Sequence, residues 1–390
     1  MTHAAPGQWL AEPFDGGTAE QFAAAHETLV TMGYSEAAVC AVAGIESIYT
    51  LAARPQRETG FQLPDSPLAV AVHLFFDGAA LPMDVVKEVI GARAFAALEG
   101  IGLLQPFLGD PTRCASFVAV YPTEGLYVAS DRVARIADVS TALPADIVYS
   151  AITPETRRFL RLMPRHACGD YLELCSGTGI AALAAAQHFA SEAWAVDLTE
   201  RSTRFAAFNA ALNGLDGVHA LEGDLYAPVA GRTFDVITAH PPYVPSFETE
   251  MVFRDGGEDG EQVTRRIIGG LADHLRPGGT FYCDCMMTDR SDAPLEQRIR
   301  AMLGSAEGEF DVLVGQVGLI APESLLAGSL AAGRITDDMA RAQRARFEEL
   351  GVERFVNTGF YIERRGGPAA ATRRRETGRG GIARTPGSRR

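Results

Sequence analysis

Four short apolar segments between Asp170 and Tyr243 constrain the fold of this chain more than any other feature. They contain the sequences YLELCSGTG, WAVDLTE, LEGDL and FDVITAHPPYV. An apolar run of this length between turn residues is typical of a strand that is buried in a parallel sheet. Because ligands bind at the carboxyl ends of such strands, we expect the polar ends of the four segments to form one site at one edge of the sheet.

The second half of the chain continues this alternation of strand and helix patterns. We expect strands at 171–174, 193–197, 218–221, 234–239, 280–285 and 310–315, and helices at 178–189, 200–212, 260–275 and 294–303. This order predicts an α/β fold with a Rossmann-like, doubly wound, mostly parallel sheet. A helical insertion is expected at about 322–350, and a last strand at 354–362 is expected to return antiparallel as an edge partner.

The first half of the chain has mainly helical patterns. Helices are predicted at 18–32, 35–51, 67–76, 83–91 and 93–105, followed by a hairpin of 116–120 and 126–130 around Tyr-Pro-Thr-Glu-Gly. We interpret residues 18–145 as a winged-helix-like domain that caps the substrate or serves as a scaffold. The helix at 93–105 is mostly apolar, whereas a helix that recognises DNA needs a basic, polar face.

Charge divides the chain into an acidic body and a basic tail. The net charge is −14, but the tail 366–390 carries seven arginines and one glutamate, so the other residues together have a net charge of −20. Such a body repels polyanions, which makes a nucleic-acid partner unlikely. The tail is rich in Gly, Pro and Arg and is expected to be disordered, and residues 1–17 are expected to form a flexible leader. The catalytic domain is predicted at 146–365.

Other compositional features predict a cytoplasmic protein. No apolar run is long enough to span a bilayer, and the N-terminus lacks the pattern of a secretory signal. The six cysteines have no further Cys or His partners at metal-ligand spacing, so we predict buried reduced thiols and no metal site. Nothing in the sequence predicts the oligomeric state.

The polar ends of the predicted strands suit a ligand that has no phosphate group. The glycines of Ser176-Gly177-Thr178-Gly179 allow close approach of the backbone, but neither GxGxxG nor a Walker-type GxxxxGK[ST] sequence occurs. Asp197 can accept from both hydroxyls of a ribose, and Asp224 can accept from the exocyclic amine of adenine. Glu173 can hold an ammonium group directly or through water. These partners fit a ligand with adenine, ribose and an amino-acid ammonium group.

The order of these segments resembles that of class I S-adenosylmethionine (SAM)-dependent methyltransferases. More narrowly, it resembles the HemK/PrmC-type glutamine N5-methyltransferases and related amino-methyltransferases, which carry Asn- or Asp-Pro-Pro-Tyr after the fourth strand. The equivalent here is His240-Pro241-Pro242-Tyr243. The likeness continues through FRDGGEDG (253–260) and RPGGTFY (276–282), and ITPET (152–156) is weakly similar to the segment that precedes the family's domain.

This resemblance implies SAM as the cofactor and S-adenosylhomocysteine as its product. The cofactor-binding residues that it implies are Glu173, Cys175, Gly177, Gly179, Asp197, Leu198, Asp224 and Leu225. Cys175 departs from the glycine that is usual in that turn. Arg254 and Asp255 are expected to brace a loop rather than to touch the substrate.

The resemblance also implies that His240, Pro241, Pro242 and Tyr243 bind the acceptor, with His240 and Tyr243 as catalytic residues. In the family, the Asn side chain and a proline carbonyl accept hydrogen bonds from a planar nitrogen while the aromatic ring stacks on it. Neutral imidazole has one donor and one acceptor nitrogen and titrates near neutral pH. His240 can therefore take a proton from an amine or hydroxyl group, which favours an amine, imidazole-type or hydroxyl acceptor over an amide, or it only replaces the asparagine hydrogen bond.

The sequence thus predicts a SAM-dependent methyltransferase that acts on a nitrogen of a small metabolite or a peptide-like substrate. Several alternatives stay open at this point. They are methylation of a protein glutamine, of a nucleobase amine in RNA or DNA, or of an oxygen atom, a use of SAM other than methyl donation, and a SAM-binding regulator without turnover.

Overall fold

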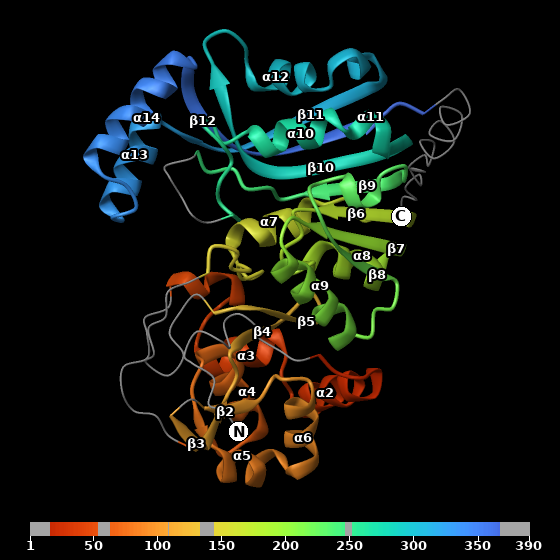
Figure 1. Ribbon diagram of the computed structural model, residues 1–390, viewed down its shortest axis with the longest axis vertical. Coiled ribbons are helices and arrows are strands. Elements are labelled where there is room, and N and C mark those ends of the chain that lie inside the picture. Colours follow the sequence, from red (N-terminus) through yellow and green to blue (C-terminus); the bar gives the residue numbers. More distant parts are fainter. Residues whose placement is uncertain (1–15, 54–62, 108, 133–143, 246–251, 367–390) are drawn as a thin grey trace, which may run out of the picture.

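The computed structural model describes residues 16–53, 63–107, 109–132, 144–245 and 252–366. These residues form an N-terminal, mainly helical part and a C-terminal α/β part, which follow one another along the long axis of the molecule (Figure 1). Apart from Gly16, Gly17 and Gly366, the predicted leader and the predicted tail lie outside the described residues.

The helices of the N-terminal part begin and end largely where the sequence predicts. They are α2 (Ala19–Thr31), α3 (Glu36–Ala43), the 3-10 helix η1 (Ile48–Ala53), α4 (Pro67–Ala71), its continuation as the π-helix η2 (Val72–Asp77), α5 (Met83–Ile90) and α6 (Ala92–Gly100). Thr18 caps α2, because its side-chain oxygen accepts a hydrogen bond from the amide of Gln21. The second predicted helix is shorter than expected, since Gly44 ends α3 in the left-handed conformation with φ 67°.

The predicted hairpin forms, but it does not join the other strands of the N-terminal part. Strands β4 (Val118–Thr123) and β5 (Leu126–Asp131) pair antiparallel as a separate two-stranded ribbon. A different set of strands, β1 (Leu81–Pro82), β2 (Gln105–Phe107) and β3 (Asp110–Ala115), forms a three-stranded sheet in the order β1-β3-β2. The strands that we expected to form a wing therefore stand apart from the sheet of the helical part, and the winged-helix-like interpretation stays a prediction.

The C-terminal part is built on a seven-stranded sheet in the order β11-β12-β10-β9-β6-β7-β8. Its strands are β6 (Cys168–Leu174), β7 (Ala190–Asp197), β8 (Val218–Glu222), β9 (Phe234–Ala239), β10 (Leu275–Arg290), β11 (Phe310–Ile320) and β12 (Val352–Arg364). The five strands from β10 through β8 in this order pair parallel, whereas β12 is antiparallel to both of its neighbours. The predicted doubly wound, mostly parallel α/β sheet is confirmed.

Helices cover both faces of this sheet. On one face lie α7 (Pro154–Leu162), α8 (Ile180–His188) and α9 (Glu200–Leu212), and on the other lie α10 (Gln262–Gly269), α11 (Leu271–His274) and α12 (Leu295–Met302). Two 3-10 helices, η3 (Ala227–Val229) and η4 (Gly304–Glu309), connect further elements. Within the described ranges, no helix is long and apolar enough for a membrane span.

The last strand was predicted at the wrong place in the sheet. β12 lies between β10 and β11 rather than at the edge. Phe360 and Ile362 of β12 are fully buried, so this strand suits an interior position. The long connection between β11 and β12 hides this neighbour relation from local sequence patterns.

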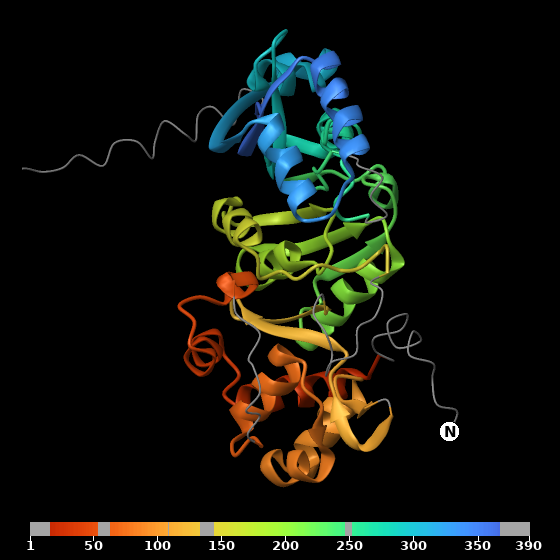
Figure 2. The ribbon, with the colours of Figure 1, turned by 90° about the vertical axis from the view of Figure 1, so that its left-hand side faces the viewer.

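That connection is the predicted helical insertion, which forms α13 (Pro322–Ala331) and α14 (Asp337–Glu349). The two helices pack beside β12 (Figure 2). Leu326 and Phe347 of these helices belong to one apolar cluster with Met286 of β10 and Phe355 of β12. Tyr243 packs against the same apolar cluster. The insertion therefore lies next to the predicted acceptor site.

The N-terminal ribbon is joined to the C-terminal part through α9. The side-chain amide of Asn209 accepts from the backbone N–H of Ala129 at 2.7 Å and donates to the Ala129 carbonyl at 3.0 Å. Asn213 makes the same pair of hydrogen bonds with the backbone of Tyr127. These two side chains thus take the place of a neighbouring strand along β5.

Candidate functional site

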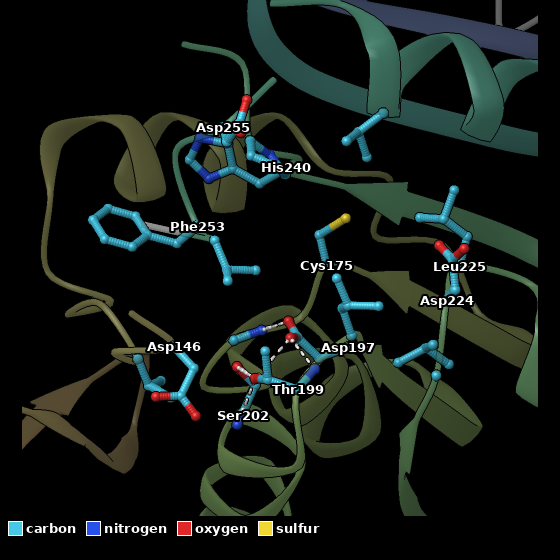
Figure 3. A pocket seen from close by; sticks show the side chains of 18 of the residues that line it. Asp146, Cys175, Asp197, Thr199, Ser202, Asp224, Leu225, His240, Phe253 and Asp255 are labelled. Atoms are coloured by element: carbon cyan, nitrogen blue, oxygen red, sulfur yellow. Dashed lines mark hydrogen bonds between the residues drawn. The ribbon is translucent and has the colours of Figure 1, made fainter. Parts of the chain in front are cut away.

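A cavity of about 410 Å³ lies at the carboxyl ends of β6, β7 and β9 (Figure 3). The sheet order reverses at β6, since the strands that follow it in the chain lie on both of its sides. Such a reversal point is where open α/β sheets bind ligands. Eight of the residues that the sequence assigns to cofactor or acceptor line this cavity: Cys175, Gly177, Asp197, Leu198, Asp224, Leu225, His240 and Pro242.

The turn between β6 and α8 brings its backbone against this cavity. Cys175 has φ 55° and Gly177 has φ 51°, both in the left-handed region. A methyl group placed on Gly177 would find no atom within 4 Å, so that position faces open space. Cys175 carries a side chain, and the left-handed backbone conformation costs such a residue about 1–2 kcal/mol. Backbone strain of this kind concentrates at binding sites.

Asp197 holds that turn in place. Its Oδ2 accepts a hydrogen bond from the amide of Gly177 at 2.8 Å, and its Oδ1 accepts from the amide and the hydroxyl of Thr199 at 3.2 and 3.3 Å. A carboxylate has about four acceptor positions, so Asp197 keeps capacity for a ligand hydroxyl. Its position fits the predicted contact with a ribose.

The predicted adenine side of the cavity is formed by the end of β8 and the residues after it. Asp224 and Leu225 lie across the cavity from Phe253 in the view of Figure 3. Oδ2 of Asp224 accepts from Arg266 at 2.6 Å, which leaves Oδ1 for another donor. Leu225 has φ 53°, Leu198 exposes 56% of its surface, and both residues line the cavity.

Glu173 lies beneath the turn and is almost fully buried. Its two carboxylate oxygens accept hydrogen bonds from the amides of Ala181 and Ala182 at the start of α8, at 3.3 and 2.8 Å. Burial nevertheless raises the pKa of Glu173 to about 8, because the charged form loses hydration. Glu173 lines a second cavity that adjoins the first, and an ammonium group there would favour its charged form.

Gly179 is the one predicted cofactor residue that lines neither of these two cavities. It has φ 75°, and a methyl group on it would come within 2.9 Å of the side chain of Ala206 in α9. The structure therefore gives Gly179 a packing role between α8 and α9. The sequence pattern of the turn does not distinguish this role from a cofactor contact.

The second cavity, of about 520 Å³, lies on the other side of the turn and of His240. Cys175, Gly177, His240 and Phe253 line both cavities, so these four residues mark their junction. The remaining residues of the predicted acceptor motif divide between them: Pro242 lines the first, and Pro241 and Tyr243 line the second. Among the described residues, the lining begins at Asp146, so no described residue of the predicted capping domain 18–145 contributes to either cavity.

The ring of His240 is held between two aromatic rings. The centroid of Phe159 in α7 lies 5.4 Å away, and that of Tyr243 lies 5.9 Å away with the ring planes 19° apart. Burial lowers the pKa of His240, and the nearby charge of Asp284 only partly opposes this effect. The imidazole is therefore neutral at pH 7.

An ion pair that the sequence analysis did not single out lies beside His240. Arg158 of α7 donates to both oxygens of Asp284 in β10, at 2.8 and 2.6 Å. Asp284 is fully buried and also accepts from the hydroxyl of Tyr282 at 3.3 Å. The only sequence signal for this pair is an acidic residue within the apolar run FYCDCMM. The pair fixes α7, and with it Phe159, against the sheet.

The segment FRDGGEDG folds over the acceptor motif. The amide of Val244 donates to the carbonyl of Arg254 at 2.9 Å, and Gly260 approaches the carbonyl of Tyr243 so closely that a methyl group would lie 2.4 Å from it. Oδ1 of Asp255 accepts from the amide of Gly257, and Asp255 also lines the first cavity. Arg254 lines the second cavity. Whether these two residues only brace the loop stays a prediction.

Glu261, just after this segment, anchors it to β10. It is fully buried and accepts from the amide and hydroxyl of Thr288 at 2.7 Å and from Arg298. Phe253 stacks on Tyr149 with 5.2 Å between centroids. Both aromatic rings line the second cavity, and the sequence patterns give no signal for this pair.

Comparisons with known proteins find similar sequences for the part of the chain that contains this site. Residues 147–310 match the family model of the methyltransferase small domain. A ribosomal protein uL3 glutamine methyltransferase of Bradyrhizobium diazoefficiens is 37% identical over 126 residues, which cover 29% of this chain and 39% of that protein. A release factor glutamine methyltransferase of Gloeobacter violaceus is 34% identical over 128 residues, covering 30% of this chain and 45% of that protein.

A third relative is a putative protein N5-glutamine methyltransferase of Methanocaldococcus jannaschii, 36% identical over 116 residues that cover 28% of this chain and 58% of that protein. The chain thus spans less than two thirds of the length of each of these relatives. Residues 147–310 therefore match a methyltransferase small domain, and the chain is similar to glutamine methyltransferases over 116–128 residues.

Proposed function

We propose that this protein transfers a methyl group from SAM to a planar nitrogen of a peptide-like acceptor, with a protein glutamine side chain as the leading candidate. The observation that carries the proposal is the place of His240, which lines both cavities next to Tyr243. The first cavity, together with the end of the second cavity at Glu173, is then the cofactor site, and the rest of the second cavity is the acceptor site. The names of the relatives, which are glutamine methyltransferases, support the same acceptor class.

The cofactor supplies an electrophilic methyl group on a sulfonium centre. In the proposed cofactor site, Asp197 accepts from the ribose, Oδ1 of Asp224 accepts from the adenine amine, and Glu173 attracts the ammonium group. The backbone at Cys175 and Gly177 lets the ligand lie close to the turn. These residues bind and orient, which is the main demand of an in-line displacement from a good leaving group.

The environment of His240 favours an amide over an amine as the acceptor. A protonated amine must lose its proton before attack, and an imidazole whose pKa is lowered is a weaker base for that purpose. An amide nitrogen has no such proton to lose before attack, and it gives up one of its N–H protons only as the new N–C bond forms and the thioether departs. The neutral ring can accept a hydrogen bond from an amide N–H, as the family's Asn does, while the ring of Tyr243 packs against the planar group.

The other proposed features concern partners and compartment. The acidic body disfavours methylation of a nucleobase. The aromatic walls of the second cavity favour binding of an acceptor over a role in SAM binding alone. The six cysteines are free thiols, and Cys283 and Cys285 are buried, which agrees with a proposed cytoplasmic location. Within the described residues, no group of three or more His, Cys, Asp or Glu side chains is arranged for a metal ion.

Mass spectrometry of cell extract incubated with the protein and isotopically methyl-labelled SAM tests this function. We expect the label on a peptide or protein amide nitrogen, and we expect Asp197→Ala to abolish it at low SAM concentration. Label in RNA, in DNA or on a small amine would contradict the proposed acceptor. SAM binding without labelling of any acceptor would instead support a regulator.

A further inference from the structure

Two arginines converge on the second cavity from separate segments of the chain. Arg254 comes from the segment that folds over the acceptor motif, and Arg334 comes from the connection between α13 and α14. Arg254 is half-buried, whereas Arg334 is exposed. Residue 334 lies outside the stretch 147–310 that matches the methyltransferase small domain. The insertion therefore adds a cation to the acceptor site that the domain itself does not supply.

Neither arginine has a carboxylate partner among the described residues. Other arginines of the described chain form ion pairs, such as Arg158 with Asp284, Arg201 with Asp131 and Arg298 with Glu261. Arg334 makes a long hydrogen bond of 3.5 Å to the carbonyl of Gly328. Two guanidinium groups that share a cavity without a carboxylate partner among the described residues are notable in a chain with 49 acidic and 35 basic residues.

The two cations are close enough to influence each other. Burial lowers the pKa of Arg254, and the positive charge of Arg334 lowers it further. Two like charges that share a cavity are destabilising unless an anion lies between them. This end of the acceptor cavity is therefore electropositive.

The two acidic residues that line the same cavity are Glu155 and Glu173. Glu173 accepts from the backbone of α8 and is the proposed partner of the SAM ammonium group. The charge of Glu155 raises the pKa values of His240 and Tyr243, so Glu155 lies near these two residues. The cavity thus has an aromatic, hydrogen-bonding end at His240 and a cationic end at Arg254 and Arg334.

We propose that Arg254 and Arg334 bind a carboxylate of the acceptor, so that the substrate class is an amide that carries a carboxylate group nearby. This inference rests on the proposed function. Guanidinium groups match a carboxylate through paired, parallel hydrogen bonds. A cavity of about 520 Å³ has room for an amino acid or a short peptide segment. The carboxylate comes from an acidic side chain next to the methylated residue or from the end of a chain.

Calorimetry on the full chain saturated with S-adenosylhomocysteine tests this inference without turnover. One pair of probes is N-acetylglutamine and its carboxamide, which differ in a terminal carboxylate. The other pair is acetyl-Gln-Asp-amide and acetyl-Gln-Asn-amide, which differ in a side-chain carboxylate. We expect the charged member of at least one pair to bind about tenfold more tightly, and the pair that shows the difference identifies the source of the carboxylate.

Arg254→Gln and Arg334→Gln should each remove this preference, while the affinity for S-adenosylhomocysteine stays unchanged. Arg341→Gln is the matched control, because Arg341 belongs to the same insertion, is exposed and pairs with Asp338. Equal binding of both members of each pair to the unmodified protein would overturn the proposal, as would an unchanged preference in both variants. Competition by inorganic phosphate but by neither carboxylate would also overturn it.

The failure of the proposed function is distinguishable from the failure of this inference. If labelled SAM transfers no methyl group to any amide, the function is wrong, whereas the binding preference still reports on the arginines. If amides are methylated but the charged and neutral probes bind equally, the function holds and the carboxylate subsite does not.

Discussion

The imidazole of His240 packs against the ring of Phe159, with 5.4 Å between the ring centroids. Phe159 belongs to α7, which Arg158 and Asp284 fix to the sheet. The helix that precedes the methyltransferase sheet therefore sets the position of the histidine in the acceptor motif. This contact also buries the imidazole and lowers its pKa.

The pH dependence of methyl transfer should reflect that lowered pKa. His240 stays neutral until the pH falls below its ordinary value of 6.5, so the rate should hold through pH 6.5 and decline only in more acidic solution. His240→Asn keeps an acceptor without a titrating group. We expect its rate at pH 8 to stay within about tenfold of the unmodified protein, and its acidic decline to vanish. Initial rates between pH 5 and 8 would check this, and an acidic decline retained in His240→Asn would assign the titration to another group.

Asp197→Ala should weaken SAM binding. The substitution removes the proposed acceptor for the ribose and also the brace on the amide of Gly177. Loss of hydrogen bonds to a charged group costs about 1.5–3 kcal/mol, which corresponds to a Kd raised about 10- to 150-fold. Calorimetry with S-adenosylhomocysteine measures the change. Asp216→Ala, at an exposed position away from the cavity, is the control, and equal affinities of the two variants would refute the cofactor placement.

Gly177→Ala should mainly weaken SAM binding, whereas Gly179→Ala should mainly lower the stability of the fold. Both positions have left-handed backbone, but only Gly179 has a neighbour at 2.9 Å. Gly179→Ala should lower the free energy of unfolding by about 2–4 kcal/mol, from backbone strain and overpacking against Ala206. Gly177→Ala should cost about 1–2 kcal/mol and instead weaken SAM binding, because its methyl group enters the cavity. Denaturant unfolding and calorimetry on both variants separate the two effects. A greater loss of stability in Gly177→Ala would reverse the assignment.

SAM binding should release a proton near pH 7. The pKa of Glu173 is raised to about 8 by burial, so its carboxyl group is mostly protonated at pH 7 in the free protein. A bound ammonium group favours the carboxylate and lowers that pKa, so binding should tighten as pH rises toward 8. Calorimetry in buffers of different ionisation enthalpy measures the released proton. Glu173→Gln should abolish the release, and a release that persists in this variant would point to a different group.

Burial of Glu173 also makes the stability of the fold depend on pH. The contribution of Glu173 decreases as the pH rises, whereas that of a salt-bridged carboxylate increases. Its folded pKa lies above its ordinary value of 4.5, so the protonated form stabilises the fold. That contribution is fully present below pH 4.5 and is lost as the pH rises through about 8. Thermal unfolding of Glu173→Gln should therefore show less decline between pH 5 and 8 than the unmodified protein.

Local sequence patterns predicted single helices, strands and helix caps, which depend mainly on residues that are close in the sequence. The buried runs 171–174 and 234–239 are strands, and the predicted helix 200–212 coincides with α9. Thr153, just before Pro154, caps α7, because its side chain accepts from the amide of Thr156. Patterns of two or 3.6 residues carry this information within a single element.

Relations between distant segments were not predictable in this way. The interior place of β12 depends on a neighbour more than 30 residues away, across α13 and α14. Arg254 and Arg334 come together only because the insertion packs beside Tyr243. Gly179 looks like a cofactor glycine in the sequence, and only the position of Ala206 shows why glycine is needed there. In each case the missing information is a contact that no local pattern encodes.

The hydrogen bonds from Asn209 and Asn213 to β5 have a consequence for synthesis on the ribosome. The apolar core of the N-terminal part includes Phe205, Phe208 and Leu212 of α9, and the side-chain amides of that helix complete the ribbon. The first 132 residues therefore leave the ribosome before the helix that finishes their core has been made. The nascent N-terminal part cannot complete its core, and it keeps an apolar surface exposed, until about 80 more residues have emerged.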